Sequence, residues 1–293
     1  MDLAGIEGHV SLTVTRMAPF APTEHVIVDG VEIALRRAGA GQPLLLLHGI
    51  PTSSRLWDAV GAELSSEFDV IAPDLVGFGE SAKPGDRDVS MAAQARLQPQ
   101  LLDALGIGRV VLIGHDIGGA AAQRMAVDAP ERVSALGLID SVSFDSWPIF
   151  RMRALRATAP PLARRWPRLW FFWFELLLRP NVPKGIGREA LVASLAAWSA
   201  DSAGAEAFMR NARALDPRIT EEIAPRLAEV RVPAHVVWGE RDPFQRVRWA
   251  SKLRDAIPGA TLTTLAGGHF LPWELPTEVA AEIRELAGRV RGA

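Results

Sequence analysis

The 293-residue sequence lacks cysteine, which excludes disulfide bonds, cysteine-ligated metals and a thiol nucleophile. It also lacks tyrosine, so no phenol is available to donate a proton in a reaction. Neither sign of charge prevails, because the net charge is −2 and no long basic run occurs; this argues against a nucleic-acid partner. The 48% of hydrophobic and 23% of charged residues are typical of a globular protein.

Long hydrophobic runs are also absent from the sequence. The most apolar stretch, Leu169–Leu178, is too short to cross a bilayer and contains Glu175. The first twenty residues include Asp2 and Glu7 and do not show a basic start followed by an apolar stretch, so we expect no signal peptide. These features predict a cytoplasmic protein without a membrane partner, whose oligomeric state the sequence leaves unknown.

Short apolar runs and helical stretches alternate along most of the chain. Residues 24–37 alternate in polarity around Asp29-Gly30 and predict a β-hairpin. The apolar runs predict strands of a mostly parallel sheet, covered on both faces, at 44–47, 70–72, 110–113, 135–139, 234–238 and 260–265. Helices are predicted between most of them, at 53–66, 90–105, 119–129, 245–256 and 277–290. The pattern predicts an α/β layered fold.

The alternation stops between residues 143 and 216, which are rich in Trp, Arg, Leu and Pro and predict several helices without a strand. We therefore expect a core of residues 1–142 and 217–293 and a helical cap of residues 143–216 over the carboxyl ends of the strands. The alternative is that these helices form an extra packing layer with no part in binding.

The segment G-H-D-I-G-G at 114–119 ends a predicted strand and begins a predicted helix. This glycine spacing is typical of a nucleophile elbow, in which a sharp turn presents one side chain over the end of the sheet. Asp116 stands at the central position, so we interpret it as a nucleophile. The alternative is that Asp116 only caps the helix, since Asp is a favoured N-cap residue.

Two further loops complete this candidate site. The loop H-G-I-P at 48–51 follows the first predicted parallel strand, and in elbow hydrolases such a loop donates one backbone N–H group to an oxyanion hole. The two donors would be Ile50 and Ile117, whereas we expect His48 to pack and form hydrogen bonds. The loop G-G-H-F at 267–270 follows the last strand and places His269 as the general base.

Three acidic residues are candidates for the partner of His269. Asp242 lies in the turn G-E-R-D-P after a predicted strand and gives the chain order nucleophile, acid, histidine. Glu240 lies two residues earlier, and Asp140 ends the strand G-L-I-D. We favour Asp242 and keep Glu240 and Asp140 as alternatives.

The sequence resembles the α/β-hydrolase superfamily, and within it the aspartate-nucleophile branch of haloalkane dehalogenases and epoxide hydrolases. His48–Trp57 (H-G-I-P-T-S-S-R-L-W), Ala72–Pro84 (A-P-D-L-V-G-F-G-E-S-A-K-P) and Gly267–Glu274 (G-G-H-F-L-P-W-E) carry this resemblance. It extends from about residue 24 to 290 and is thin across the predicted cap. The resemblance implies Asp116 as nucleophile, His269 as base, Asp242 as its partner, and no cofactor or metal.

The groups that stabilise the leaving group in these families do not carry over to this chain. Many dehalogenases have Asn at the position of Ile50 and Trp at that of Ile117, and fluoroacetate dehalogenases have Arg after the nucleophile. Epoxide hydrolases use cap tyrosines. Indole N–H groups of the predicted cap are possible replacements (Trp166, Trp170, Trp173, Trp198), and Trp173 falls near the leaving-group tryptophan of related enzymes. The alternative is that these aromatic residues only pack the cap.

The predicted function is covalent hydrolysis of a small apolar organic substrate by water, with dehalogenation favoured and epoxide hydrolysis as the alternative. A cofactor-free lyase or isomerase, in which Asp116 and His269 only transfer protons, is a further hypothesis. A non-catalytic ligand-binding protein on the same scaffold is another.

Overall fold

The protein was analysed in a computed structural model, which describes residues 20–148, 152–153, 160–184 and 186–291. Residues 1–19, over which we expect no signal peptide, and residues 149–151 and 154–159 of the predicted cap lie outside the described residues. None of the described helices is long and apolar enough to cross a membrane.

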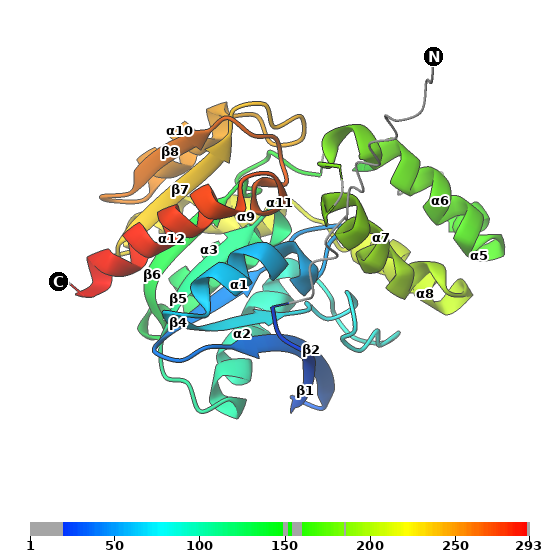
Figure 1. Ribbon diagram of the computed structural model, residues 1–293, viewed down its shortest axis with the longest axis horizontal. Helices are drawn as coiled ribbons and strands as arrows, with labels where there is room; N and C mark the ends of the chain where they lie inside the picture. The colour runs from blue at the N-terminus through cyan, green and yellow to red at the C-terminus, as the bar shows by residue number, and fades with distance from the viewer. Residues whose placement is uncertain (1–19, 149–151, 154–159, 185, 292–293) are drawn as a thin grey trace, which may run out of the picture.

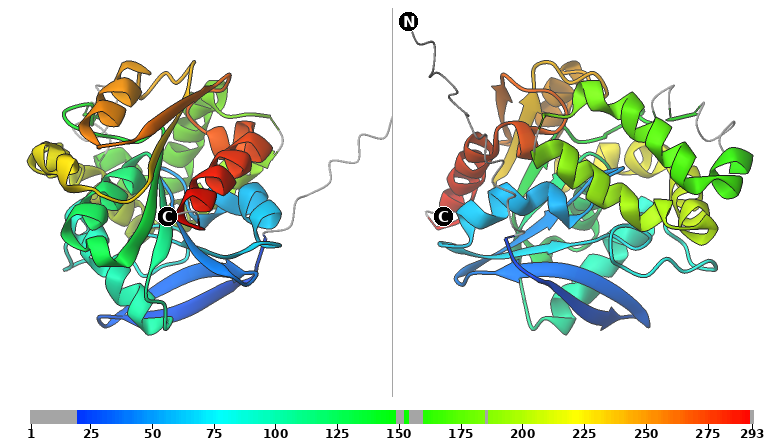
Figure 2. Two further views of the ribbon diagram at one scale, coloured as in Figure 1. Left: turned by 90° about the vertical axis from the view of Figure 1, so that its left-hand side faces the viewer. Right: turned by 45° about the vertical axis from the view of Figure 1, so that its right-hand side comes forward.

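The strands form one eight-stranded sheet in the order β1-β2-β4-β3-β5-β6-β7-β8. β1 and β2 pair as an antiparallel hairpin and β2 pairs antiparallel with β4, whereas all other neighbours are parallel. Figure 2 shows the twisted sheet from the hairpin at one edge to β8 at the other. The strands are Thr23–Val28 (β1), Val31–Ala38 (β2), Gln42–Leu47 (β3), Phe68–Pro73 (β4), Val110–His115 (β5), Val133–Ile139 (β6), Ala234–Gly239 (β7) and Thr261–Leu265 (β8).

Helices cover both faces of the sheet, α1 and α12 on one and α2, α3 and α10 on the other (Figures 1 and 2). The α-helices are Asp58–Leu64 (α1), Met91–Ala104 (α2), Ile117–Asp128 (α3), Pro160–Arg165 (α5), Pro167–Leu178 (α6), Ile186–Ser199 (α7), Ser202–Arg213 (α8), Arg218–Ile223 (α9), Arg248–Ala256 (α10), Leu271–Glu274 (α11) and Pro276–Arg291 (α12). Short 3₁₀ helices occupy Ser54–Trp57, Pro130–Arg132, Arg179–Asn181 and Ala224–Glu229. The predicted α/β layered fold is confirmed.

The central strands are apolar because both of their faces are covered. Every residue of β4, β5 and β7 is buried. β8 differs from the prediction: it is an edge strand with exposed and partly exposed residues, and its mixture of Thr and Leu suits a half-covered strand. At the other edge, Asp29 and Gly30 form the hairpin turn with φ of 49° and 72°, a conformation for which Asp and Gly are well suited.

Between β6 and α9 the chain leaves the sheet and forms the helices α5 to α8. We call residues 143–216 the helical insertion; in Figure 1 its helices lie together at the right, beside the sheet rather than on either of its faces. Trp198 and Phe208 of α7 and α8 are fully buried and stack with aromatic residues of α6. Trp198 also contacts Phe78 and donates a hydrogen bond from Nε1 to the Gly77 carbonyl at 2.8 Å, which attaches the insertion to the core.

Candidate active site

Asp116 lies at the turn between β5 and α3, with φ of 50° and ψ of −120°. This is a strained conformation for a residue with a side chain. The backbone around it is held by hydrogen bonds: the Asp116 N–H group donates to the Ile139 carbonyl (3.3 Å), and its carbonyl accepts from Gly119 (3.0 Å) and Val142 (3.2 Å). The turn is therefore fixed by main-chain contacts, and the side chain remains available for chemistry.

The glycines beside Asp116 are required by close approach. A Cβ atom on Gly118 would lie 2.5 Å from the carbonyl oxygens of Leu47 and His48, and one on Gly49 would lie 2.5 Å from the Asp116 Cβ. Distances this short do not occur between real atoms, so larger residues at either position would push the two loops apart. The loop after β3 consequently lies directly against the elbow.

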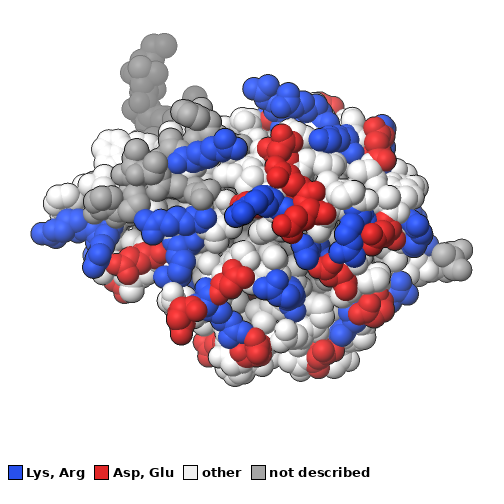
Figure 3. Space-filling view, turned by 180° about the vertical axis from the view of Figure 1, so that it is seen from behind, with Lys and Arg blue, Asp and Glu red and all other residues white. Residues whose placement is uncertain are grey.

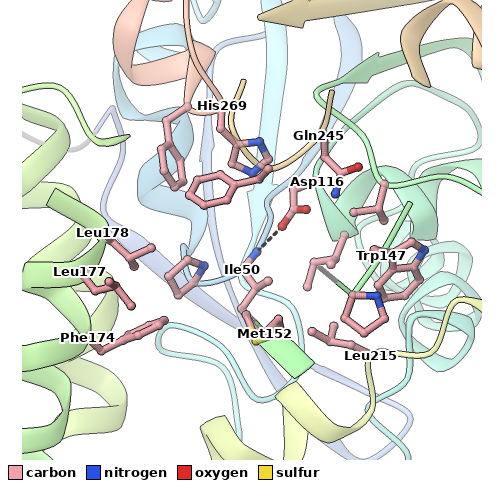
Figure 4. Close-up of a pocket in the computed structure, with 16 residues that line it drawn as sticks. Ile50, Asp116, Trp147, Met152, Phe174, Leu177, Leu178, Leu215, Gln245 and His269 are labelled. Carbon is pink, nitrogen blue, oxygen red and sulfur yellow. Dashed lines mark hydrogen bonds between the residues drawn. The ribbon is translucent and has the colours of Figure 1, made fainter. Parts of the chain in front are cut away.

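The Asp116 carboxylate faces the backbone of that loop. Its Oδ2 accepts a hydrogen bond from the Ile50 N–H group at 3.0 Å, shown as a dashed line in Figure 4. Burial raises the pKa of Asp116 to about 6, although the nearby His269 and the backbone N–H groups of Ile50 and Ile117 act in the opposite direction. The carboxylate thus carries its negative charge near neutral pH in a site with little water.

His269 lies in the loop after β8, and its Nδ1 is 2.7 Å from Asp242 Oδ2. Both side chains are buried. Burial alone would favour the neutral ring, but the charge and hydrogen bond of Asp242, together with the charges of Asp116 and Asp140, raise the pKa of His269 to about 9. The ring is therefore an imidazolium while Asp116 is ionised.

Of the three candidate acids, only Asp242 is hydrogen-bonded to His269 among the described residues. The other Asp242 oxygen, Oδ1, accepts from the backbone N–H groups of Phe244 (2.7 Å) and Gln245 (2.8 Å), which orient the carboxylate. Glu240 is exposed and lies 3.4 Å from the Thr264 hydroxyl, on the outside of the turn. The structure therefore places Asp242 rather than Glu240 beside His269.

Asp140 is buried at the end of β6, with φ of 43°. Its Oδ1 accepts from the Gly239 N–H group at 2.8 Å, and its Oδ2 has no hydrogen-bond partner among the described residues. Burial and the charge of Asp242 raise the pKa of Asp140 well above its usual range. Asp140 therefore lies near the Asp242–His269 pair, and its hydrogen bond goes to the backbone of Gly239 rather than to the ring.

Two other histidines support the site without reaching the pocket. As expected, His48 packs and forms hydrogen bonds: its Nε2 accepts from the Leu75 N–H group (3.0 Å), and its Nδ1 lies 2.9 Å from the Gly49 carbonyl. His115, which the sequence analysis did not single out, lies with its Nε2 2.8 Å from the His269 carbonyl. His115 thus fixes the main chain of the catalytic loop from the neighbouring strand.

A pocket lies between the core and the helical insertion, with Asp116 and His269 in its wall (Figure 4). Both the core and the helical insertion line it, and most of the lining is apolar. The lining residues are Ile50, Pro51, Asp116, Ile117, Val142, Trp147, Pro148, Met152, Phe174, Leu177, Leu178, Leu215, Phe244, Gln245, His269 and Phe270.

The tryptophans proposed as leaving-group donors do not line the pocket. Trp173 is 58% exposed, because it lies on the outer side of α6, whereas Phe174 and Leu177 face the pocket; the prediction that Trp173 reaches the leaving group is therefore wrong. Trp166 is also exposed, Trp170 packs inside the insertion, and Trp198 donates to Gly77. The pocket's own Trp147, which that set did not include, donates its Nε1 hydrogen to the Thr220 hydroxyl at 2.7 Å.

Gln245 is a polar pocket residue that the sequence analysis missed. It is 2% exposed, and Figure 4 shows its side-chain amide directed into the pocket beside Asp116. Its Oε1 has no hydrogen-bond partner within the described part of the chain. Buried polar groups are normally paired, so the unpaired Oε1 makes Gln245 a candidate for binding a ligand. Its position three residues after Asp242, in the same turn, was the signal available.

Comparisons with known proteins agree with the observed fold. The model of the alpha/beta hydrolase fold family matches residues 42–189. An uncharacterised protein of Mycobacterium tuberculosis is 34% identical, over 83% of this chain and 74% of its own length. The solved structure of an alpha/beta hydrolase fold protein from Burkholderia ambifaria is similar with a TM-score of 0.83 and 27% identity, covering 92% of this chain and 98% of that one.

The chain therefore belongs to the α/β hydrolase fold family, and it is an enzyme of the hydrolase class. Relatives with a printed activity differ from one another. A fluoroacetate dehalogenase of Burkholderia sp is 29% identical, over 91% of this chain and 93% of its own length. A lipase of Psychrobacter immobilis is 27% identical, over 80% and 72%. Likeness alone thus does not assign the reaction, and the residues of the site have to carry that argument.

Proposed function

We propose that the protein is a covalent hydrolase in which Asp116 attacks a saturated carbon that bears a halogen. The observation that carries this proposal is a carboxylate, not a hydroxyl, at the elbow, beside a buried His269–Asp242 pair and in an apolar pocket. A carboxylate needs no deprotonation before it attacks, and the ester it forms is cleavable by water. A serine at the same position would form a stable ether.

In the first step, one Asp116 oxygen forms a bond to the substrate carbon, and the carbon–halogen bond breaks as the halide departs with its electron pair. In the second step, His269 Nε2 takes a proton from water, and the resulting hydroxide attacks the ester carbonyl carbon. The N–H groups of Ile50 and Ile117 stabilise the oxyanion, which collapses to release the alcohol and restore the carboxylate. The net reaction converts an alkyl halide and water into an alcohol, a halide ion and a proton.

The charges of the site explain how one histidine serves this sequence. In the free enzyme the Asp116 charge contributes to the raised pKa of His269. Alkylation converts the carboxylate into a neutral ester, so that contribution disappears and the pKa of His269 falls. The imidazolium can then lose its proton and act as a base in the second step, when a base is required.

We assign the stabilisation of the leaving group to Gln245, in place of Trp173. Its amide N–H group can donate to a departing halide without giving up a proton. An epoxide would instead leave an alkoxide, which must be protonated, and an amide is not an acid near neutral pH. The absence of tyrosine from the chain supports the same choice. Epoxide hydrolysis therefore remains the second candidate.

The helical insertion acts as the cap in this proposal. Residues 1–142 and 217–293 supply the nucleophile, base, acid and oxyanion groups, and residues 143–216 close the pocket over them. The lining contributed by Phe174, Leu177 and Leu178 supports this division, because it gives the pocket an apolar wall opposite the charged groups. Such a wall favours a small apolar substrate and keeps bulk water from the reacting groups.

The proposal is tested by trapping the intermediate. The His269→Gln variant is incubated with a panel of alkyl halides and epoxides, and its intact mass is measured. We expect an added alkyl mass on the peptide that contains Asp116, since attack proceeds while hydrolysis is blocked. Wild-type turnover in ¹⁸O-labelled water should place label in the Asp116 carboxylate. Turnover that never labels this carboxylate would exclude the covalent mechanism.

A further inference from the structure

The helical insertion and the rest of the chain carry opposite charges. Residues 143–216 contain eleven Lys and Arg against six Asp and Glu, a formal charge of +5, so the remaining residues carry −7. Figure 3 shows Lys and Arg side chains gathered on the left, the side of the insertion, whereas both signs mix over the rest of that face. This polarity would orient the protein with its insertion toward an anionic surface.

The exposed apolar side chains concentrate on the same segment. Ten large hydrophobic residues are exposed within the described residues, and six of them lie between residues 166 and 177, on or beside α6. They are 39% to 58% exposed and comprise Trp166, Leu169, Phe172, Trp173, Leu176 and Leu177. Their spacing of three and four residues places them along one outer stripe of the helix. We call these six residues the α6 stripe.

Packing within the insertion does not explain the α6 stripe. The inner side of α6 is supplied by Trp170, Phe171 and Phe174, which are buried against one another and against Phe208. A helix that is apolar on all sides is expected to be covered on all sides. An apolar stripe of this length on a protein surface indicates an interaction site.

The charged residues beside the α6 stripe are cationic. Arg165 and Arg168 are exposed at the start of α6, and the Arg165 guanidinium lies 5.2 Å from the centre of the Trp166 ring. The single acid on the helix, Glu175, is neutralised by Arg179 at 2.9 Å. Aromatic and aliphatic side chains bordered by arginine are the composition of helices that lie in the surface of an anionic bilayer.

We propose that α6 docks the protein on the surface of an anionic lipid bilayer, with the α6 stripe entering the boundary between headgroups and acyl chains. A second copy of the chain fits this surface less well, because pairing two insertions would bring their positive charges together. Docking of this kind requires no membrane-spanning segment, so it agrees with the lack of such a helix among the described residues.

The α6 stripe also meets the pocket. Leu177 is 55% exposed and lines the pocket together with Phe174 and Leu178, which Figure 4 shows on the same helix. A lipophilic substrate dissolved in the bilayer would therefore pass from acyl chains to the pocket along apolar side chains. This route of the substrate rests on the proposed function, since it assigns the substrate class of that site. The docking itself does not depend on it.

The test is co-sedimentation of the full chain with vesicles of neutral phosphatidylcholine, and of phosphatidylcholine with one quarter phosphatidylglycerol, in 0.1 M salt. We expect binding to the anionic vesicles and much weaker binding to the neutral ones. Trp166→Gln, Phe172→Gln and Trp173→Gln in combination should reduce binding to anionic vesicles at least tenfold. Arg165→Gln with Arg168→Gln should reduce binding to the anionic vesicles by roughly fivefold per arginine and leave binding to the neutral vesicles unchanged.

Matched controls come from the core. Ile27→Gln removes an apolar residue of β1 that is 64% exposed, and Arg231→Gln removes an exposed arginine; both should bind vesicles as the wild type does. All of these side chains are at the surface, so circular dichroism should show folded variants. Sedimentation velocity without lipid identifies a dimer, and a dimer that the stripe variants dissociate, without vesicle binding, would overturn the proposal. A monomer that binds neither vesicle would overturn it as well.

Because these measurements contain no substrate, they succeed or fail independently of the covalent mechanism. If vesicles are bound but no alkyl adduct forms on Asp116, docking stands and the proposed reaction fails. If the adduct forms but vesicles are not bound, the reaction stands and docking fails.

Discussion

The core and the helical insertion distribute their polar and apolar groups in opposite ways. At the carboxyl ends of the strands the core buries Asp116, Asp140, Asp242 and His269, four ionisable groups within one site. The insertion instead exposes the α6 stripe and an excess of positive charge. Stability alone favours neither arrangement, since buried charge and exposed apolar surface both cost free energy. We propose on this basis that the core carries out the reaction and that the insertion gives the substrate access to it.

The largest expected effect comes from removing the nucleophile from the core. Asp116→Asn should lower kcat by about 10⁴-fold or more, since the amide is a poor nucleophile. Thermal unfolding should show a Tm equal to or above that of the wild type, because a buried charge is removed. The measurement is halide release over the same panel of substrates. A variant that retained wild-type turnover would place the chemistry elsewhere and break the comparison.

The acids of the core should differ in their effects on turnover. Asp242→Asn should reduce kcat about a hundredfold or more, since it removes the charge that orients and stabilises the His269 ring. Glu240→Gln, the matched control two residues away, should change kcat less than twofold. Asp140→Asn should have a smaller effect, because Asp140 Oδ1 binds the Gly239 N–H group, whereas Asp242 holds the His269 ring. A larger loss for Asp140→Asn than for Asp242→Asn would reverse our assignment of the acid.

Substitution of Gln245 tests whether this polar residue of the apolar pocket stabilises the departing halide. Gln245→Leu should slow formation of the alkyl-enzyme by about a hundredfold, the usual effect of losing one stabilising donor in a transition state. The rate is measured by rapid quenching and mass analysis. Hydrolysis of an ester already formed should change little, since the halide has departed by then. Equal losses in both steps would show that Gln245 acts on the water instead.

The pH dependence of stability should report the buried ionisable groups of the core. His269 has a pKa raised to about 9, so its stabilising contribution is complete below the unfolded value near 6.5 and is lost as the pH rises through 9. Asp116 has a pKa raised to about 6, so its charge destabilises the fold above that pH, and stability improves as the pH falls from 6 toward 4. The Tm measured from pH 6.5 to 9.5 should fall, and His269→Gln should flatten this part of the curve.

The smallest effect is expected on the outside of the insertion. Trp173→Phe should change kcat and KM for a water-soluble substrate less than twofold, because the side chain lies outside the pocket. A loss of tenfold or more in the rate of halide release would show that Trp173 takes part in the reaction. The outer side of the insertion would then not differ from the core in this respect. Phe174→Ala is the matched comparison within α6 and should raise KM, since Phe174 lines the pocket.

The sequence was sufficient for the parts of the protein that depend on local pattern. The hairpin at Asp29-Gly30, the order of the predicted strands and helices along the chain, and the turn at Asp116 follow from polarity, apolar runs and glycine spacing. The structure has these elements near the expected residues, although some helix bounds differ: the helix expected at 245–256 begins at Arg248. It also brings Asp242 and His269 together. Their roles in catalysis remain predictions until the variants are measured.

The features that were missed depend on the direction in which a side chain points from its helix or turn. In W-F-F-W-F at 170–174 every residue is apolar, so periodicity cannot distinguish the inner side chains from Trp173, which points outward. Gln245 reaches the pocket only because its backbone and that of Phe244 turn back to hydrogen-bond Asp242. Closeness to Asp242 in the sequence was the available signal, but a glutamine in a loop is ordinarily a surface residue.

The main-chain hydrogen bonds that hold Asp116 have a consequence for how such enzymes diversify. Every contact that fixes the strained turn is made by the backbone, to Ile139, Gly119 and Val142. The conformation of the turn therefore does not depend on which side chain stands at position 116. Replacing that side chain leaves these backbone hydrogen bonds in place. A single substitution would then put a different nucleophile beside the same histidine, acid and backbone N–H groups.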